Sequence, residues 1–384
     1  MSDKPKLSIL TIDLGMGGAQ RFISLLLPKL IHDFEVTLVL FVDYIHFEIP
    51  KDVKLVVLNP ELKSRKSYFV KIKNAFNLYH KYKKLIKTER IDISLSLLPV
   101  PNIINSFLAM SNKKVKTVIS ERCFASEMYK NNRVQMLLAK ISFPLLYHKN
   151  DVLFSNSVYI NDDLKQNFGV KMPMHVIYNP IETNPGFRID QDNIHDTNPL
   201  KIINTGRIYD AKNQKLILDA MALSEKGEYF LTILGNGELQ ETLQSEAENL
   251  GLAAFMDLKG KVSDVKNHLL ANDCFILSSN NEGFPNALLE ALSLGLPSIS
   301  TNCLSGPLEM LNDNEPVEIP VEGFYKAKFG ILVNVGDAIG LNKAMEFLKH
   351  NPEQRQLYSR LAFERTKNYN LDTVYIQVKE LLMN

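Results

Sequence analysis

The sequence predicts an α/β protein built from two domains, each with a parallel sheet. Short apolar runs alternate with stretches of helical periodicity in both halves, a pattern typical of repeated βα units. The chain has 384 residues, 45% of them hydrophobic. This length is too great for one ordinary hydrophobic core and suits two domains. A polar stretch rich in Asn, Asp and Pro, from Tyr178 to Pro199, separates the halves and is predicted to be a linker.

The first half is predicted to alternate strands with helices from its start. A glycine loop after the first strand leads into a helix over Ala19–Ile31, and a longer helix is expected over Ser67–Arg90. The predicted strands are Leu7–Asp13, Glu35–Val42, Val53–Leu58, Ile93–Leu98, Lys116–Ser120 and Val152–Asn156.

The second half restarts the same alternation after the linker. A helical run ends at Gly295, a short helix begins near Gly306, and Asp337–Asn384 is predicted to be helical. The predicted strands are Lys201–Thr205, Tyr229–Leu234, Ala254–Leu258, Cys274–Leu277 and Ser298–Thr301.

Cysteine use and hydropathy bear on the cellular setting. Cys123, Cys274 and Cys303 are odd in number and widely spaced, so neither a disulfide framework nor a zinc site is predicted, and a reducing cytoplasm is expected. Leu7–Asp13 is interpreted as a strand rather than as part of a signal peptide. No run approaches the ~20 apolar residues of a membrane span.

Charge is unevenly distributed along the chain. Residues 1–180 hold 26 Lys and Arg against 15 Asp and Glu, a net charge of +11, and the remainder holds 18 against 28, a net charge of −10. In Ser67–Arg90 lysines interleave with aromatic and aliphatic residues at helical spacing. Two interpretations stay open: a basic amphipathic helix at an anionic membrane surface, and a solvated face over a core-facing stripe.

A strand, a turn and a helix bring Glu282 to a ligand-binding position. The apolar strand Cys274–Leu277 precedes it, and Gly283 and Pro285 then force a turn. Pro285 and Asn286 start the next helix, whose free N–H groups favour phosphate. Glu290, about one turn further in, suits sugar hydroxyls, so this stretch predicts a nucleotide-sugar site.

Two cations follow the strand Lys201–Thr205. Arg207 and Lys212 flank the loop at its carboxyl end, where they suit a diphosphate that gains charge as it departs. Taken without their neighbours, two basic loop residues are equally typical of a solvated surface.

These motifs resemble those of a known enzyme family. The string EGFPNALLEALSLGLP resembles the E-x(7)-E signature of retaining GT-B glycosyltransferases of family 4, and GRIYDAKN resembles the family's GR-x(4)-K element. The start, LSILTIDLGMGGAQRFISLLLPKL, is similar to the bacterial members that add N-acetylgalactosamine to a polyprenyl-diphosphate oligosaccharide. Gln20 stands where those members usually have Glu, so no carboxylate role is carried over to it.

The resemblance implies a GT-B fold of two facing Rossmann-like domains with a cleft between them. Residues 1–180 would be the acceptor-binding domain and residues 181–370 the nucleotide-sugar-binding domain. The last helix, about 371–384, would pack back on the first domain.

The resemblance also implies roles for site residues. Arg207 and Lys212 would stabilise the leaving diphosphate, and Glu282 would orient the sugar. Glu121 and Arg122, in the string ISER, would lie on the acceptor side, although an ordinary surface ion pair is the alternative. The implied donor-binding residues are Gly17, Gly18, Gly235, Gly237, Val262, Gly283, Phe284, Pro285, Asn286, Glu290, Gly306 and Glu309.

The expected function is retaining transfer of a hexose or N-acetylhexosamine, with N-acetylgalactosamine preferred, from a UDP-sugar to a polyprenyl-diphosphate-linked glycan. The expected setting is bacterial surface glycan, lipopolysaccharide or glycoprotein assembly. The expected location is cytoplasmic and peripheral, at the anionic inner face of the cell membrane, with no nucleic-acid partner. No cofactor or metal is expected; Asp190-Gln191-Asp192 matches a DxD metal motif but lies in the linker and is interpreted as a solvated turn.

Other function classes stay open. A family 4 transferase acting on a soluble acceptor and a non-catalytic nucleotide-sugar-binding protein are the alternatives. An NAD-dependent oxidoreductase would need GxGxxG with an acidic residue about 20 positions later, and neither half supplies it.

Overall fold

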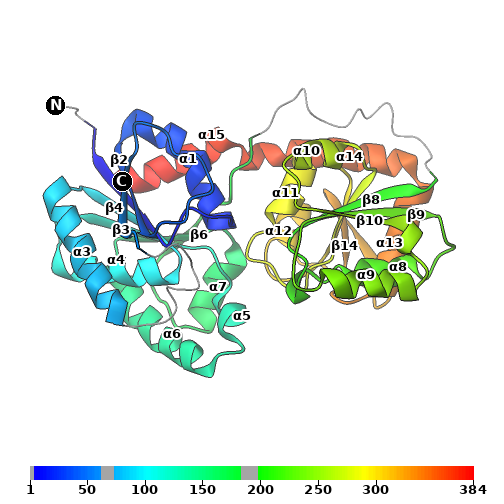
Figure 1. Cartoon of the computed structure of the whole chain (residues 1–384), viewed down its shortest axis with the longest axis horizontal. Helices are drawn as coiled ribbons and strands as arrows, with labels where there is room; N and C mark the ends of the chain where they lie inside the picture. The colour runs from blue at the N-terminus through cyan, green and yellow to red at the C-terminus, as the bar shows by residue number, and fades with distance from the viewer. Residues whose placement is uncertain (1–3, 62–72, 183–197) are drawn as a thin grey trace. The chain divides into compact units, whose positions relative to one another are not determined.

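A computed structural model describes residues 4–61, 73–182 and 198–384 of the chain (Figure 1). The chain divides into two compact units. The first unit comprises Met1–Pro180 together with Leu371–Asn384, and the second comprises Ile181–Asn370.

The first unit is built on a parallel seven-stranded sheet in the order β3-β2-β1-β4-β5-β6-β7. All six strands predicted for this half are present, and the short edge strand β7 is an addition that its three residues did not signal. The strands are β1 (Lys6–Thr11), β2 (Glu35–Val42), β3 (Lys54–Asn59), β4 (Ile93–Leu97), β5 (Lys116–Glu121), β6 (Val152–Ser155) and β7 (Met174–Val176).

Helices cover both faces of this sheet. In Figure 1, α1 and α15 lie on one side and α3, α4 and α6 on the other. The helices are α1 (Gly18–Asp33), α3 (Lys73–Glu89), α4 (Pro99–Ser111), α5 (Ala125–Tyr129), α6 (Arg133–Leu146), α7 (Val158–Gln166) and α15 (Leu371–Met383), with a 3-10 turn at Tyr147–Lys149.

Alternation along the strands explains this layering. Leu7 and Ile9 of β1 pack in one apolar cluster with residues of α1 and α15, whereas Leu10 packs in another with residues of α3 and α4. Because successive side chains of a strand point to opposite faces of the sheet, each strand contributes side chains to two apolar clusters.

The terminal helix α15 packs against α1 although more than 300 residues separate them. Lys29 Nζ lies 2.5 Å from Asp372 Oδ1, and Lys379 Nζ lies 2.8 Å from Asp33 Oδ1. Val374, Val378 and Leu382 are buried beneath these ion pairs. Apolar burial therefore attaches the helix, and the exposed ion pairs contribute little.

The lysine-rich helix α3 uses its apolar stripe internally. Leu78, Tyr82 and Ile86 are buried in the core, and the Tyr82 hydroxyl lies 3.0 Å from Ser8 Oγ. Lys81 Nζ donates to the Leu58 carbonyl at 2.7 Å. Of the two interpretations of this helix, the core-facing stripe therefore holds for the described residues; residues 67–72 of the predicted helix lie outside them.

The second unit repeats the plan with a seven-stranded sheet in the order β10-β9-β8-β11-β12-β14-β13. The five predicted strands are present, but β13 and β14 were not predicted, and β13 pairs antiparallel with β14 at the edge. The strands are β8 (Leu200–Thr205), β9 (Tyr229–Leu234), β10 (Met256–Gly260), β11 (Cys274–Leu277), β12 (Ser298–Thr301), β13 (Phe324–Ala327) and β14 (Gly330–Val333).

The helices of the second unit follow its strands. They are α8 (Lys215–Met221), α9 (Gln240–Asn249), α10 (Val265–Leu270), α11 (Asn286–Ser293), α12 (Pro307–Asn312), α13 (Ala338–His350) and α14 (Pro352–Thr366). No helix within residues 4–61, 73–182 and 198–384 is both long and apolar enough to cross a bilayer.

Candidate functional site

The loop between β11 and α11 carries Glu282 at the carboxyl edge of the second sheet. Its backbone is tied to the neighbouring loop after β12. The Glu282 N–H donates to the Leu304 carbonyl at 2.7 Å, and the Ser305 N–H donates to the Glu282 carbonyl at 2.9 Å. Ser305 Oγ also donates to the Gly283 carbonyl at 2.5 Å. These hydrogen bonds between the two loops fix the backbone that carries Glu282.

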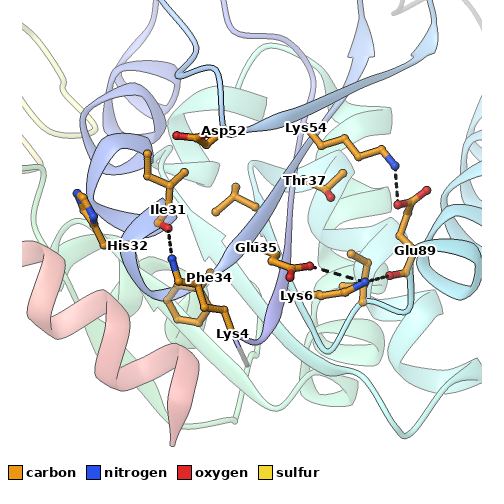
Figure 2. Close-up of a pocket in the computed structure, with 12 residues that line it drawn as sticks. Lys4, Lys6, Ile31, His32, Phe34, Glu35, Thr37, Asp52, Lys54 and Glu89 are labelled. Carbon is orange, nitrogen blue, oxygen red and sulfur yellow. Dashed lines mark hydrogen bonds and ion pairs between the residues drawn. The ribbon is translucent and has the colours of Figure 1, made fainter. Parts of the chain in front are cut away.

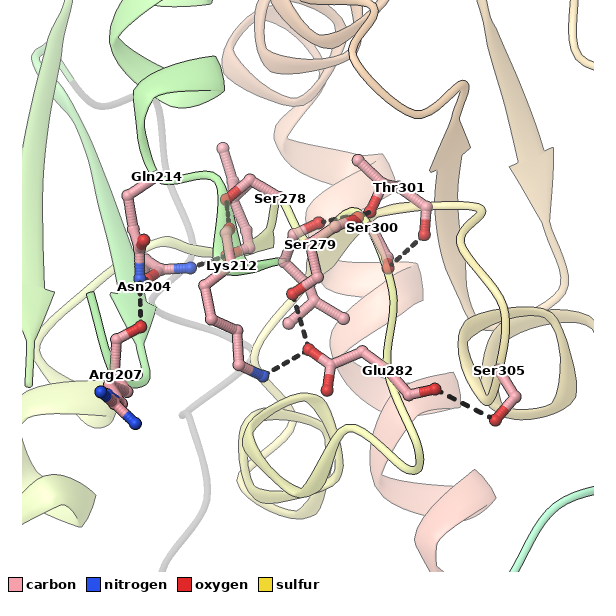
Figure 3. A network of polar contacts seen from close by, with 12 residues as sticks. Asn204, Arg207, Lys212, Gln214, Ser278, Ser279, Glu282, Ser300, Thr301 and Ser305 are labelled. Atoms are coloured by element: carbon pink, nitrogen blue, oxygen red, sulfur yellow. Dashed lines mark hydrogen bonds and ion pairs between the residues drawn. The ribbon is translucent and has the colours of Figure 1, made fainter. Parts of the chain in front are cut away.

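Lys212, which is 70 residues earlier in the chain, forms a very short ion pair with Glu282 Oε1 (Figure 3). Ser279 Oγ donates to the same oxygen at 2.6 Å. The two charged side chains are only 18% and 9% exposed. Among the residues that the structure describes, none donates to Glu282 Oε2. This pair therefore keeps one carboxylate oxygen available to a ligand.

The charge of Lys212 is secured by its partner. Burial by itself lowers the pKa of the Lys212 ammonium, but the adjacent Glu282 carboxylate outweighs burial and raises that pKa above its ordinary value. Burial raises the pKa of the nearby Cys303 thiol to about 12, so Cys303 stays protonated near neutral pH. The pair thus consists of one ammonium and one carboxylate.

Arg207 occupies a different setting from Lys212. Its guanidinium lies 2.6 Å from Glu238 Oε2, and both side chains are mostly exposed. In Figure 3 the Arg207 side chain lies apart from the Lys212–Glu282 pair. The sequence predicted that the two cations act together at one loop. In the structure Lys212 pairs with Glu282, whereas Arg207 lies on the surface and pairs with Glu238.

The glycines Gly235 and Gly237 are needed for packing between two loops of the protein. A Cβ on Gly235 would lie 2.0 Å from the Gly206 carbonyl oxygen, and one on Gly237 would lie 1.8 Å from the Ile208 carbonyl oxygen. The Ile208 N–H donates to the Asn236 carbonyl at 3.1 Å. The resemblance implied that Gly235 and Gly237 bind the donor; in the structure their close contacts are with the loop that carries Arg207.

Gly306 brings a second pair of loops together. It precedes α12 with φ of 103°, and a Cβ there would lie 2.4 Å from Pro285 Cδ. Pro285 in turn precedes α11, so the starts of α11 and α12 are in contact. Glu309 in the first turn of α12 is buried, and Glu290 in α11 is half-buried. The predicted residues around both helix starts thus form one neighbourhood.

The remaining predicted donor residues flank this neighbourhood. Gly283 and Asn286 are half-buried, and the Phe284 ring lies 6.1 Å from that of Tyr369. Val262 follows β10, which is three strands from β11 in the sheet. At ~4.8 Å per strand this separates the two loops by about 14 Å, which suits the two ends of an extended ligand.

In the first unit the glycine loop precedes α1. Gly17 and Gly18 begin that helix, and a Cβ on Gly15 would collide with the Tyr44 ring. Buried Asp13, at the end of β1, accepts from the Gly15 N–H at 2.9 Å and from Gln20 Nε2 at 3.2 Å. The sequence did not single out Asp13; its contact with Gln20 explains why an amide fits here, since Glu would set two carboxylates together.

Glu121 ends β5 and is fully buried. Its Oε1 accepts from Asn102 Nδ2 at 2.8 Å and from the Tyr147 hydroxyl. Within the described residues its Oε2 has no hydrogen-bond partner. Burial outweighs the hydrogen bonds and raises the pKa of Glu121 to about 7. Neither Asn102 nor Tyr147 was signalled by sequence spacing.

Arg122 is also buried, and it does not pair with Glu121. Its Nε donates to Ser120 Oγ at 2.8 Å and Nη1 donates to Asn179 Oδ1 at 2.8 Å. The guanidinium carbon lies 3.5 Å from the centre of the Phe22 ring. Burial lowers the pKa of Arg122 to about 9, so the guanidinium remains charged near neutral pH. The alternative of an ordinary surface ion pair is therefore wrong.

A separate cavity of about 560 Å³ lies at the amino ends of β1, β2 and β3 (Figure 2). Its charged groups largely satisfy one another, since Lys54 Nζ lies 2.5 Å from Glu89 Oε2 and Lys6 Nζ lies 3.7 Å from Glu35 Oε2. Ligands of parallel α/β sheets bind at the carboxyl ends of the strands. This cavity is therefore not the candidate site.

No group of three or more His, Cys, Asp or Glu side chains suited to a metal ion occurs in the described part of the chain. Asp190 and Asp192 lie outside the described residues.

Comparison with known proteins adds to this geometry. The family model described as "Glycosyl transferases group 1" matches residues 187–365. The chain is 31% identical over 375 residues to a Campylobacter jejuni protein, with 95% of this chain and 96% of the relative covered. That relative is named N-acetylgalactosamine-N,N'-diacetylbacillosaminyl-diphospho-undecaprenol 4-alpha-N-acetylgalactosaminyltransferase.

A second Campylobacter jejuni protein is 24% identical over 373 residues, covering 96% of each chain. It is named as an alpha-1,4-N-acetyl-D-galactosaminyltransferase of a PP-undecaprenol glycan. The fold is also similar to that of Anabaena HepE, solved in complex with UDP and glucose, with a TM-score of 0.75 and 16% identity over 98% of this chain and 99% of that one. The predicted GT-B fold of two parallel-sheet α/β domains is therefore confirmed.

Proposed function

Because the chain belongs to the group 1 glycosyltransferases, also called family 4, we propose that it transfers N-acetylgalactosamine from UDP to a polyprenyl-diphosphate-linked oligosaccharide. The transfer proceeds with retention, and the product enters a bacterial surface glycan, lipopolysaccharide or glycoprotein. The nucleotide sugar binds to the second unit and the acceptor to the first.

The observation that carries the donor half of this proposal is the Lys212–Glu282 pair at the carboxyl edge of the second sheet. A lysine ammonium has three donor hydrogens, so Lys212 is able to keep Glu282 and still donate to a phosphate. Glu282 Oε2 accepts from a sugar hydroxyl, and the backbone of Gly283 and Phe284 positions the same sugar. Glu290, one turn into α11, accepts from the ribose hydroxyls.

The reaction follows from that placement as a front-face displacement. The acceptor hydroxyl oxygen bonds to the anomeric carbon on the face from which the β-phosphate oxygen departs. The electrons of the broken carbon–oxygen bond leave with UDP, and the hydroxyl proton passes to a phosphate oxygen. Lys212 stabilises the charge that grows on the diphosphate, and Arg207 assists once it releases Glu238.

The acceptor half of the proposal is supported by similarity that extends across nearly the whole chain, the first unit included. Both Campylobacter relatives carry undecaprenol-linked substrates in their names. Glu121 and Arg122 end an interior strand of the first sheet, and we assign them to the acceptor side. The net charge of +11 over residues 1–180 supports a peripheral location at the anionic inner face of the cell membrane.

A donor comparison tests the proposal. The full chain is incubated with a polyprenyl-diphosphate-linked glycan in detergent and with UDP-N-acetylgalactosamine, UDP-N-acetylglucosamine, UDP-galactose or UDP-glucose. We expect the fastest UDP release with UDP-N-acetylgalactosamine and an α-linked product by NMR. A β-linked product would refute retention, and transfer only to a water-soluble glycan would refute the lipid-linked acceptor.

A further inference from the structure

The helix α6 (Arg133–Leu146) presents a row of large apolar side chains to solvent. Five of them, with spacings of three and four residues, are between 50% and 68% exposed, namely Val134, Leu137, Leu138, Ile141 and Leu145. At 3.6 residues per turn these positions lie on one side of the helix. A contiguous apolar row of this kind on a protein surface marks a site of interaction.

The opposite side of α6 is firmly packed, so the exposed row is not the result of a loosely attached helix. Ala139 and Phe143 are buried. The Phe143 ring stacks on Tyr147 with centroids 4.5 Å apart and lies 5.3 Å from the Phe168 ring. At its start the helix is capped by Asn132, whose Oδ1 accepts from the Gln135 N–H at 3.0 Å.

Charge around the row has one sign on α6. The helix contains Arg133 and Lys140, both exposed, and no acidic residue. Just before it, Glu127 of α5 is neutralised by Lys130 at 2.6 Å. An exposed apolar row beside cations suits a binding surface that is both apolar and anionic.

The neighbouring helix α4 also exposes apolar side chains. It contacts α6, contains no charged residue and exposes Phe107 and Met110. In Figure 1, α6 forms the outer rim of the first unit beyond α4. Exposed apolar side chains therefore occur on both of these adjacent helices.

We propose that α6 is a membrane-docking helix, which lies in the plane of an anionic bilayer with its five apolar side chains among the acyl chains. Arg133 and Lys140 contact the lipid phosphates at the level of the headgroups. The proposal deepens the peripheral location proposed above by assigning it to α6 rather than to α3, whose apolar stripe is buried.

Charge also decides between a bilayer and a second copy of the chain. A two-fold dimer repeats the same patch on both partners, so a contact through α6 would bring the Arg133 and Lys140 side of each helix toward like charges. A bilayer of anionic lipid offers opposite charge along the whole row.

The first test uses tryptophan as a reporter, because the chain has none of its own. Leu137→Trp is mixed with vesicles of phosphatidylethanolamine and phosphatidylglycerol. We expect a blue shift of its emission and quenching by brominated lipid. The matched control is Leu223→Trp, an exposed leucine of the second unit, whose emission should not change. Identical emission of both variants on vesicles would overturn the proposal.

The second test separates α6 from α3. Each exposed aliphatic side chain that enters the acyl region contributes about tenfold or more to binding. Leu137→Ser with Ile141→Ser should therefore weaken vesicle co-sedimentation by about a hundredfold. Lys84→Glu with Lys87→Glu on α3 should weaken it less than Arg133→Glu with Lys140→Glu on α6. A larger loss from the α3 pair would overturn the assignment.

Two further outcomes are distinguishable. If Leu137→Trp is shielded without lipid and the molecular mass rises with concentration, α6 joins two copies and the proposal is wrong. The double serine variant should keep turnover on a short-chain acceptor in solution and lose it on an acceptor embedded in vesicles. Vesicle binding without transfer to any lipid-linked acceptor would refute the proposed function and leave the docking helix standing.

Discussion

Each unit places a carboxylate and a cation at the carboxyl end of an interior strand, and the two pairs are built in opposite ways. Glu282 and Lys212 are far apart in the chain and form an ion pair near the surface. Glu121 and Arg122 are adjacent in the chain and form none with each other, because Glu121 accepts from Asn102 and Tyr147 whereas Arg122 donates to Ser120 and Asn179.

The difference lies in what each charge has for a partner. Lys212 has the Glu282 carboxylate as its partner, and this partner outweighs burial and raises the pKa of the ammonium above its ordinary value. Glu121 has only the neutral donors Asn102 and Tyr147, and its pKa rises to about 7. The fold therefore gives Lys212 a charged partner and leaves Glu121 with neutral ones.

The largest expected effect is on turnover after loss of Lys212. Lys212→Ala should lower kcat by ~10²–10³, because removal of one preorganised donor to a developing charge typically costs that much. UDP affinity should fall much less. Initial rates of UDP release measure the first quantity and calorimetry the second.

The matched control for that experiment is Lys215→Ala, which removes an exposed lysine paired with Asp219 four residues further along the chain. Its kcat should remain near that of the unsubstituted protein. Near-native turnover of Lys212→Ala would show that the leaving-group role belongs elsewhere.

The next effect concerns Glu121 and pH. A carboxyl whose pKa is raised on folding binds its proton more tightly in the folded state, so its contribution to stability is complete below about pH 4.5 and is lost as the pH rises to about 7. The loss is on the order of 3 kcal/mol. Glu121→Gln should flatten the dependence of the free energy of unfolding on pH across that window.

Chemical denaturation at several pH values measures this effect. Glu127→Gln, which removes a partly exposed carboxylate on α5, is the matched control. If the unsubstituted protein and Glu121→Gln showed parallel pH profiles, Glu121 would titrate as an ordinary surface carboxyl, and the contrast between the two units would fail.

A smaller effect should appear in double-mutant cycles of unfolding. Lys212 and Glu282 share an ion pair. The loss of unfolding free energy in the double variant Lys212→Met with Glu282→Gln should therefore differ from the sum of the two single losses by about 1–3 kcal/mol. Glu121→Gln and Arg122→Met have separate partners and should be additive to within about 0.5 kcal/mol. Equal coupling in both cycles would remove the distinction drawn above.

The smallest expected effect is that of a chelator. The cation proposed to face the diphosphate in the second unit is an ammonium, so EDTA should leave the rate of UDP release essentially unchanged. Loss of activity with rescue by Mn²⁺ would contradict this and would bring Asp190 and Asp192 into the site.

Part of the molecule follows from the sequence because it depends on local periodicity. Alternating apolar runs and helical patterns predicted eleven strands, six in the first half and five in the second, and all are present. The strand, turn and helix around Glu282 were also predictable, since Gly283 and Pro285 determine the backbone there. The strands β7, β13 and β14 were not predicted; β7 and β13 lie at the edges of their sheets and, with the sequences MHV and FYKA, lack the continuous apolar run of an interior strand.

Tertiary structure alone decided which side chains meet and which faces stay bare. Contacts between distant segments create the ion pair of Lys212 with Glu282 and that of Arg207 with Glu238. They also give Glu121 a neutral partner, Tyr147, rather than a charged one. Helices α3 and α6 both carry apolar rows, yet α3 buries its row against the sheet whereas α6 exposes one beyond its packed side. Periodicity describes the faces of a helix, but only packing against the rest of the fold determines which face is covered.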